Sequence, residues 1–270
     1  MILVTGATGN TGGRVAARLA ERGLDVRTAS RTGPTDVRFD WADESTHAKA
    51  LENVTAAYLV APVGVPDPHE VISDFVDRAL EAGVRRIVLL SSSAIAEGDP
   101  GLGKAHVAVR ERVPEWAVLR PSWFMQNFSG EHFHAASIAS ESAIYTATGA
   151  GRVAFVDAGD IADVAVHALT DPTPHNTDHV ITGPAPLSCD EVAAQISERL
   201  NRRIRHISLD ARSARARLES VGFAPGFAAL LVDLDLRIAQ GSEDRTTTTV
   251  LDVAGHRPRS FAAHLRAIGN

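Results

Sequence analysis

The sequence predicts an α/β fold in which a parallel sheet carries helices on both faces and a smaller α+β region follows. Two observations support this fold class. Up to residue 120, short β-branched apolar runs alternate with helical patterns, as in consecutive βαβ units. Beyond Arg120 and Pro121 the alternation loosens into short strands mixed with helices that have their own start signals.

The elements of the first half follow one another regularly. Apolar runs predict strands at residues 2–5, 24–30, 36–39, 56–61, 85–91 and 116–120. The first helix comes after a glycine-rich turn, with Val15, Ala16, Leu19 and Ala20 on one face and Gly23 at its end. The order of the strands in the sheet does not follow from this pattern.

The second half predicts a cap interleaved with late strands. Short strands are expected at residues 143–148, 152–156, 179–183 and 205–209. Asp160 precedes apolar residues at helical spacing, and Ser188 with Glu191 forms a capping-box pattern. We therefore expect a main domain over residues 1–125, with later strands returning to it from about 145–185. Residues 126–270 then form mainly a cap, and the boundary between the two is soft.

Composition limits the partners of the chain. A formal net charge of −6 argues against nucleic acid or an anionic membrane as the main partner and favours small molecules. The single cysteine, Cys189, cannot form an internal disulfide, and no leader or membrane segment is evident, so we expect a cytoplasmic protein. We expect it to be a monomer or a homodimer. The spacing of His132 and His134, without an accompanying cysteine or carboxylate cluster, predicts no metal site.

The stretch TGATGNTGG, residues 5–13, predicts a phosphate-binding loop. It lies between a buried strand and a helix, where free backbone amides and the helix dipole favour negative charge. Gly6 permits a sharp turn, Gly9 leaves room for a pyrophosphate, and Gly12 lets the helix pack on the strand. Thr8, Asn10 and Thr11 add polar groups that can reach phosphate or ribose. Together these features predict a Rossmann-type, doubly wound parallel sheet that binds a dinucleotide.

The residue after the second strand predicts which dinucleotide is bound. Ser30 and Arg31 stand there, without the carboxylate that would hold the ribose of NAD, and an arginine accommodates the 2′-phosphate of NADP. We therefore expect NADP(H), although Arg31 can also be read as a solvated loop residue.

Two later loops are expected to complete the nucleotide site. Asp40 either contacts the adenine amino group or caps the next helix. The neighbouring Trp41 is also expected to contact the cofactor. The backbone of Ala61, Pro62 and Val63 either contacts the ribose or nicotinamide or forms an ordinary turn.

Several stretches resemble the NmrA-like, atypical short-chain dehydrogenase/reductases: VTGATGNTGG, ASR, FDWAD, RRIVLLSSSA, VLRPSWFMQNFS, FVDAGDIADVAVHAL and GHRPRSFAAHLR. The similarity covers nearly the whole chain. VLRPSWFMQNFS is similar to a segment of ergot-alkaloid-type reductases, and the layout resembles triphenylmethane reductase and NAD(P)H:quinone reductases of the same group. The resemblance implies a Rossmann fold with a small C-terminal α+β substrate-binding cap and hydride transfer from NADPH.

The catalytic tyrosine of ordinary short-chain dehydrogenases is absent. Lys104 is available after the fifth strand, but Pro100 stands four residues before it, where the tyrosine is expected. The resemblance to isoflavone-reductase-like enzymes implies an active-site lysine at this place. Lys104 is thus the catalytic candidate, with a cofactor-ribose contact or a merely solvated lysine as alternatives, and His106 is a weaker candidate acid. Ser91, at the carboxyl end of the fifth strand, is expected to touch the nicotinamide.

The segment after the sixth strand predicts a substrate pocket. Trp123, Phe124 and Phe128 are expected to line an apolar wall, Asn127 to supply a neutral polar group, and Ser92 to reach the substrate. The alternative is that these aromatic residues are ordinary core. The function we expect is an NADPH-dependent reductase of a small conjugated acceptor such as a quinone or an imine or iminium. The alternative is a non-catalytic NADP(H)-binding redox sensor or regulator of NmrA type.

Overall fold

The structure is a computed structural model that describes residues 1–62, 64–65 and 67–268. The described chain divides into two compact units, each made of several segments. Unit 1 comprises Met1–Pro121, Ala158–Ile181 and Thr249–His256, and unit 2 comprises Ser122–Asp157, Thr182–Thr248 and the residues from Arg257 onward. No helix among the described residues combines the length and apolar character that crossing a bilayer requires.

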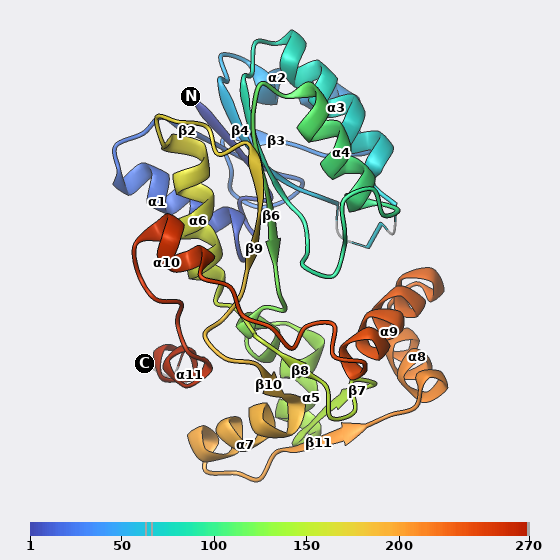
Figure 1. Cartoon of the computed structure of the whole chain (residues 1–270). Coiled ribbons are helices and arrows are strands. Elements are labelled where there is room, and N and C mark those ends of the chain that lie inside the picture. Colours follow the sequence, from blue (N-terminus) through green and yellow to red (C-terminus); the bar gives the residue numbers. More distant parts are fainter. Residues whose placement is uncertain (63, 66, 269–270) are drawn as a thin grey trace. The chain divides into compact units, whose positions relative to one another are not determined.

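Unit 1 is built on a parallel sheet whose strands, seven among the described residues, run in the order β3-β2-β1-β4-β5-β6-β9 (Figure 1). The strands are β1 (Ile2–Thr5), β2 (Val26–Ser30), β3 (Val37–Arg38), β4 (Ala56–Val60), β5 (Arg86–Leu90), β6 (Glu115–Pro121) and β9 (Thr177–Ile181). The predicted first six strands are confirmed: β1 has the expected bounds, β2 to β5 are shorter than expected, and β6 is longer by one residue at each end. Strand order reverses at β1, between β2 and β4, which is where doubly wound sheets bind ligands at the carboxyl ends of their strands.

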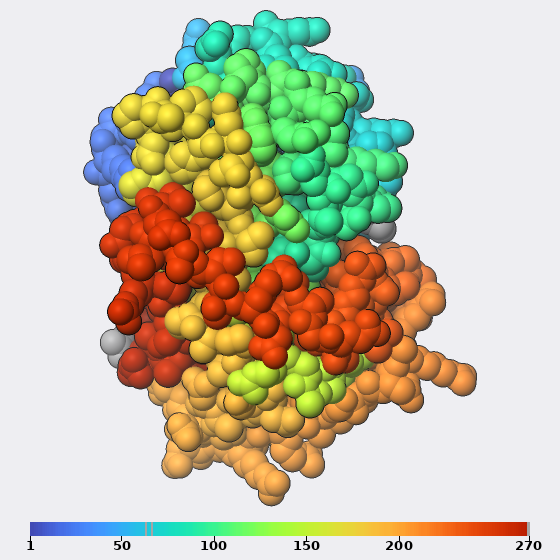
Figure 2. Space-filling view, viewed as in Figure 1, coloured from blue at the N-terminus to red at the C-terminus, as the bar shows by residue number. Residues whose placement is uncertain are grey.

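Helices cover both faces of this sheet (Figure 1). They are α1 (Gly12–Glu21), η1 (Glu44–Thr46), α2 (His47–Leu51), α3 (His69–Glu81), α4 (Leu102–Arg112), α6 (Ala158–Thr170) and α10 (Thr249–Ala254). On one face, Phe75 of α3 and Val109 of α4 join Leu3 and Leu59 in the core. Each large side chain buried in this way contributes about 1.5–3 kcal/mol. On the other face, α1 and α10 both pack against α6, and Figure 2 shows α10 in red beside α6 in yellow.

Unit 2 combines helices with short strands. Its elements are η2 (Met125–Phe128), α5 (Phe133–Glu141), β7 (Ala143–Thr146), β8 (Arg152–Val153), β10 (Leu187–Ser188), α7 (Cys189–Leu200), β11 (Arg205–Ser208), α8 (Ala211–Ser220), α9 (Pro225–Ala239) and α11 (Phe261–Ala267). β7 pairs in parallel with β11, and β8 pairs antiparallel with β10. The predicted capping box is present, since Ser188 and Glu191 bond each other's backbone amides.

The path of the chain differs in detail from the expected boundaries at residues 125 and 145–185. Unit 1 ends at Pro121, and of the later strands only β9 joins its sheet among the described residues. β7 and β8 stay in unit 2, because β7 finds its hydrogen-bonding partner in β11, about 60 residues further on. The short helix α10 also returns to unit 1, which the sequence pattern did not indicate.

Candidate functional site

The glycine-rich loop has the geometry that its spacing predicts. Gly6 has a φ of +61°, a conformation that suits glycine. A Cβ on Gly12 would lie 2.3 Å from the Gly6 carbonyl oxygen, so α1 passes the loop too closely for any side chain. At Gly9 a Cβ would lie 3.2 Å from the same oxygen. The loop therefore requires glycine at residues 6 and 12 for backbone reasons.

The loop leaves backbone donors free. Two internal bonds hold it, from the Gly9 amide to the Gly6 carbonyl at 2.9 Å and from the Gly13 amide to the Gly9 carbonyl at 3.1 Å. Within the described chain, the amides of Thr8, Asn10, Thr11 and Gly12 donate to no backbone carbonyl. The first turn of α1 contains no acidic side chain. Such a helix start is suited to a phosphate group.

The loops after β1, β2, β3 and β4 meet around a cavity of about 420 Å³ at the carboxyl ends of the strands. The cavity is lined by Gly6, Thr8, Gly9, Ser30, Arg31, Thr32, Phe39, Asp40, Trp41, Ala42, Val60, Ala61, Pro62, Val65 and Val71. The structure thus brings together nine of the residues that the sequence assigned to the nucleotide. The additional lining residues are mostly apolar; Phe39 and Ala42 belong to the stretch FDWAD, and Thr32, Val60, Val65 and Val71 to no motif of the sequence.

Arg31 has an exposed side chain in the wall of this cavity, directly after β2. Among the described residues it has no hydrogen-bond or ion-pair partner. The hydroxyl of the neighbouring Ser30 donates to the Thr32 carbonyl and so shapes the loop. The guanidinium is therefore available to an anionic group in the cavity.

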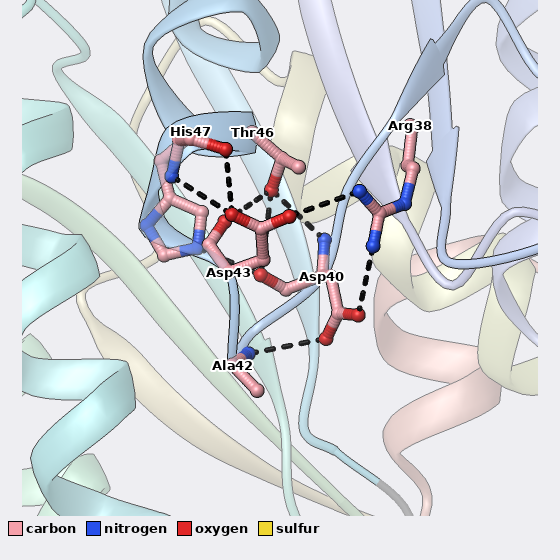
Figure 3. Close-up of polar contacts among 7 residues, drawn as sticks. Arg38, Asp40, Ala42, Asp43, Thr46 and His47 are labelled. Atoms are coloured by element: carbon pink, nitrogen blue, oxygen red, sulfur yellow. Dashed lines mark hydrogen bonds and ion pairs between the residues drawn. The ribbon is translucent and has the colours of Figure 1, made fainter.

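Asp40 lies at the centre of a polar cluster, which Figure 3 shows. Its carboxylate accepts the Ala42 amide at 3.1 Å and pairs with Arg38 at 3.4 Å. The cap of the following helical turn is Asp43, which accepts the Ser45 amide at 3.2 Å. The alternative that Asp40 caps that helix is therefore wrong, because Asp40 closes the tighter turn before it.

Trp41 forms a fixed wall of the cavity. Its indole N–H donates to the Val60 carbonyl at 3.0 Å, which joins the loop after β3 to the end of β4. The ring lies edge-on to Phe39 and Phe75, with centroids 5.0 and 5.3 Å away. A planar group in the cavity would thus meet a rigid aromatic surface.

Some predicted nucleotide residues do not line the cavity. Asn10, Thr11 and Gly12 belong to the glycine-rich loop and the start of α1 but do not line the cavity. Ser91 is buried, and its amide bonds the Leu119 carbonyl at 2.7 Å. Val63 lies outside the described residues.

Lys104 does not line this cavity. It is exposed in the first turn of α4, and its charge adds a little to the hydrogen bond with His69 that lowers the pKa of Asp67. His106 is buried against Trp116, with ring centroids 6.0 Å apart, and burial lowers its pKa. The two side chains thus lie on different faces of α4, and His106 has the environment of a core residue.

A second cavity, of about 110 Å³, lies within unit 2, and we call it the unit 2 cavity. It is lined by Trp123, Asn127, His132, Phe133, His134, Ser137, Tyr145, Thr146, Leu209, Ala214, Arg217, Leu218, Val221, Leu231, Leu234 and Asp235. The structure places Trp123 and Asn127 in its wall. The sequence pattern indicated no functional role for Leu231, Leu234, Asp235 or Tyr145.

Phe124, Phe128 and Ser92 do not line the unit 2 cavity. Phe128 is buried in the core of unit 2, edge-on to Phe155 and Phe261 and stacked on His134. Phe128 is therefore a core residue, which was the alternative interpretation of these aromatic side chains, because three aromatic rings enclose it. Ser92 belongs to unit 1, where its hydroxyl accepts the Ala94 amide at 3.3 Å.

Burial sets the charge of the unit 2 cavity. It lowers the pKa of His132 to about 4 and that of His134 to about 3, so both rings are neutral near pH 7. It raises the pKa of Asp235 to about 6. Arg217 pairs with Glu141 and lies 3.5 Å over the Tyr145 ring.

One group of side chains in the described chain has the spacing of metal ligands: Asp160, Asp163 and His256, with ligand atoms within 4.8 Å of one another. Arg18 already pairs with Asp163 at 2.6 Å, and His256 lies 3.2 Å from the same carboxylate. These contacts join α1, α6 and the end of α10, which accounts for the group by packing within unit 1.

The strand order and the glycine-rich loop at its reversal define the class of the molecule, a Rossmann-type α/β protein. The profile of the NmrA-like family matches residues 1–222, and the chain belongs to that family.

Curated relatives cover almost the full chain. The chain is 44% identical to an uncharacterized oxidoreductase, YesF, of Bacillus subtilis, over 97% of this chain and 92% of the relative. It is 39% identical to an agroclavine dehydrogenase of Claviceps fusiformis, over 97% and 94% of the two chains.

Solved structures share the fold at lower identity. An NADPH-dependent quinone oxidoreductase of Escherichia coli in complex with NADPH matches with a TM-score of 0.82 and 22% identity, over all of both chains. Triphenylmethane reductase of Citrobacter in complex with NADP(H) matches with a TM-score of 0.81 and 22% identity, over 99% of both chains.

Proposed function

We propose that this chain is an NADP(H)-dependent oxidoreductase that transfers hydride to a small conjugated acceptor. The observation that carries the proposal is the 420 Å³ cavity of unit 1, which we call the unit 1 cavity: the glycine-rich loop residues Gly6, Thr8 and Gly9 line it together with Arg31, whose guanidinium has no partner among the described residues. The names of the relatives at 39–44% identity, an oxidoreductase and a dehydrogenase, support the reaction class.

The residues of unit 1 fit such a cofactor. The free amides of Thr8, Asn10, Thr11 and Gly12 suit a pyrophosphate, and no acidic side chain opposes it in the first turn of α1. Arg31 then holds the 2′-phosphate by charge-assisted hydrogen bonds. Asp40 and Trp41 bound the space for adenine. The backbone of Ala61 and Pro62 is then available to contact the cofactor between adenine and nicotinamide. Val63 and Ser91 are further candidate contacts of the nicotinamide.

The bound cofactor supplies the hydride, and the chain supplies position and, where required, a proton. The two tyrosines of the sequence are Tyr58 and Tyr145, so α4 carries no phenol that acts as an acid beside Lys104. An acceptor that is already positive requires no acid, since hydride addition neutralises it. Lys104 is the candidate proton donor for a neutral acceptor such as a quinone.

The acceptor site that we propose is the unit 2 cavity, where Trp123 offers an aromatic face and Asn127 a neutral amide. Planar conjugated molecules suit this lining. The quinone, dye and agroclavine named for the relatives belong to those proteins, and they guide the choice of acceptors to be tested here.

The test is anaerobic NADPH consumption with a panel of quinones, cyclic imines and triarylmethane dyes. The proposal predicts turnover with at least one class, and Lys104→Met should lower kcat for neutral acceptors more than for cationic ones. Tight NADPH binding without turnover on any class would contradict the enzyme and favour the alternative, a redox sensor of NmrA type.

Trp123→Ala tests the acceptor cavity separately. Loss of the indole should raise KM for the acceptor at least about fivefold, since an aromatic stacking contact contributes about 1 kcal/mol beyond its buried area. The Kd for NADPH, measured in the absence of acceptor, should stay unchanged. Trp116→Phe, in the core of unit 1, is the control for the loss of an indole. An unchanged KM in Trp123→Ala would place the acceptor elsewhere.

A further inference from the structure

Asp235 is the carboxylic acid among the described residues that line the unit 2 cavity. It lies on α9, one helical turn after Leu231 and next to Leu234, both of which also face the cavity. One carboxylate oxygen accepts the Ala147 amide at 2.8 Å. Among the described residues, no cationic side chain forms an ion pair with it.

The other ionisable groups of the wall do not offset this charge. His132 and His134 are neutral near pH 7. Arg217 pairs with Glu141, which also accepts the Tyr145 hydroxyl at 2.9 Å. The cavity therefore keeps about one uncompensated negative charge when Asp235 is ionised.

Asp235 is only partly exposed and has no cationic partner among the described residues, so its carboxylate is less well solvated than in open water, and an organic cation that enters the cavity offsets this cost. Aromatic rings such as those of Trp123 and Phe133 in the same wall also attract a cation through their faces, whereas the Tyr145 ring already carries the Arg217 guanidinium. An anionic ligand would face Asp235, and a neutral ligand would leave it unpaired.

We propose that Asp235 makes the unit 2 cavity selective for planar aromatic molecules that carry one positive charge. The inference rests on the proposed function in one respect, that this cavity receives the acceptor. Within that function it selects the iminium or other cationic acceptor over the neutral quinone.

The test measures equilibrium binding without any nucleotide, so its outcome is separate from that of the turnover assay. The probes are 1-methylquinolinium and 1-methylnaphthalene, which have the same shape and differ by one charge. Quenching of tryptophan fluorescence reports binding, and Trp123→Phe shows whether the signal comes from the cavity. We expect the wild type to bind the cation at least about tenfold more tightly than the neutral probe.

Asp235→Asn removes the charge and keeps an oxygen that can accept the Ala147 amide. It should abolish the preference, whereas Asp235→Glu, which keeps the charge, should retain most of it. Asp233→Asn is the matched control, since Asp233 lies exposed on the same helix and pairs with Arg237 at 2.9 Å. Equal affinity of the wild type for both probes, an unchanged preference in Asp235→Asn, or no binding of either probe would overturn the proposal.

The pH dependence gives a second readout. Because burial raises the pKa of Asp235 to about 6, affinity for the cation should fall as the pH is lowered from 8 to 5, while affinity for the neutral probe stays constant. Among the groups that face Asp235 or lie behind it, burial lowers the pKa of His132, His134 and His206 and raises that of Cys189. Asp190 lies 3.6 Å from His206, and Arg217 stays paired with Glu141. A cation affinity that does not change between pH 5 and 8 would contradict the role of Asp235.

Discussion

Arg31 and Asp40 show how single side chains divide the work at the edge of the unit 1 cavity. Asp40 is held by the Ala42 amide and by Arg38, so its position is fixed by its own turn. Arg31 has no such partner among the described residues. A charge held in place shapes the cavity, and a charge left free can bind an anion.

Arg31→Ala should therefore weaken NADPH binding far more than NADH binding. The lost interaction is a charge-assisted hydrogen bond to phosphate of about 1.5–3 kcal/mol, which corresponds to about a 10- to 150-fold rise in the Kd for NADPH. Calorimetric titration with each nucleotide measures it. Arg85→Ala is the control, because Arg85 is exposed before β5, at the opposite end of the strands. Equal losses for both nucleotides would exclude Arg31 as the 2′-phosphate contact.

At the scale of elements, the turn from β1 to α1 is the most tightly constrained part of unit 1. The Gly6 carbonyl lies where a Cβ on Gly12 would be, and the Gly6 conformation itself requires a positive φ. Strand, loop and helix are thus fixed together, and the loop that results lines the cavity with Gly6, Thr8 and Gly9.

Gly12→Ala should destabilise the protein by about 1–3 kcal/mol, since the new methyl group forces α1 away from β1. Urea unfolding measures the change. Gly226→Ala is the control, because a Cβ on this helical glycine would meet nothing within 4 Å. A stability of Gly12→Ala equal to that of the control would show that the turn adjusts freely.

The elements of unit 1 could be predicted from the sequence because their signals are local. Runs such as residues 85–91 are apolar and bounded by turns, and the glycine spacing of residues 6–12 has a backbone cause that the structure shows directly. One of the two alternatives for Asp40, that it caps the next helix, was wrong. Asp40 and Asp43 both precede a polar helical start, and only the backbone path distinguishes them.

At the scale of the whole molecule, the lining of the unit 2 cavity could be predicted only in part from the sequence. Trp123 and Asn127 could be predicted, since they follow β6 directly. Leu231, Leu234 and Asp235 reach the same cavity from α9, more than 100 residues later, through tertiary packing that no local pattern encodes. A carboxylate on an otherwise amphipathic helix gives no sign in the sequence that it faces a cavity.

The proposed function assigns complementary tasks to the two units. Unit 1 presents unpaired donors and one free arginine to an anionic dinucleotide, within a chain whose net charge is −6. Unit 2 presents aromatic rings and one carboxylate to a planar acceptor. The reaction then depends on bringing hydride donor and acceptor into contact.

The most direct test of this account follows the hydride itself. The protein is incubated anaerobically with the acceptor panel and NADPH that carries deuterium on one defined face of C4, and the products are analysed by mass spectrometry. The proposed function predicts that one of the two C4-labelled forms transfers its deuterium to an acceptor, so that the reduced product carries the label, and that the other form does not. Bound NADPH that transfers deuterium from neither face, to any member of the panel, would contradict it.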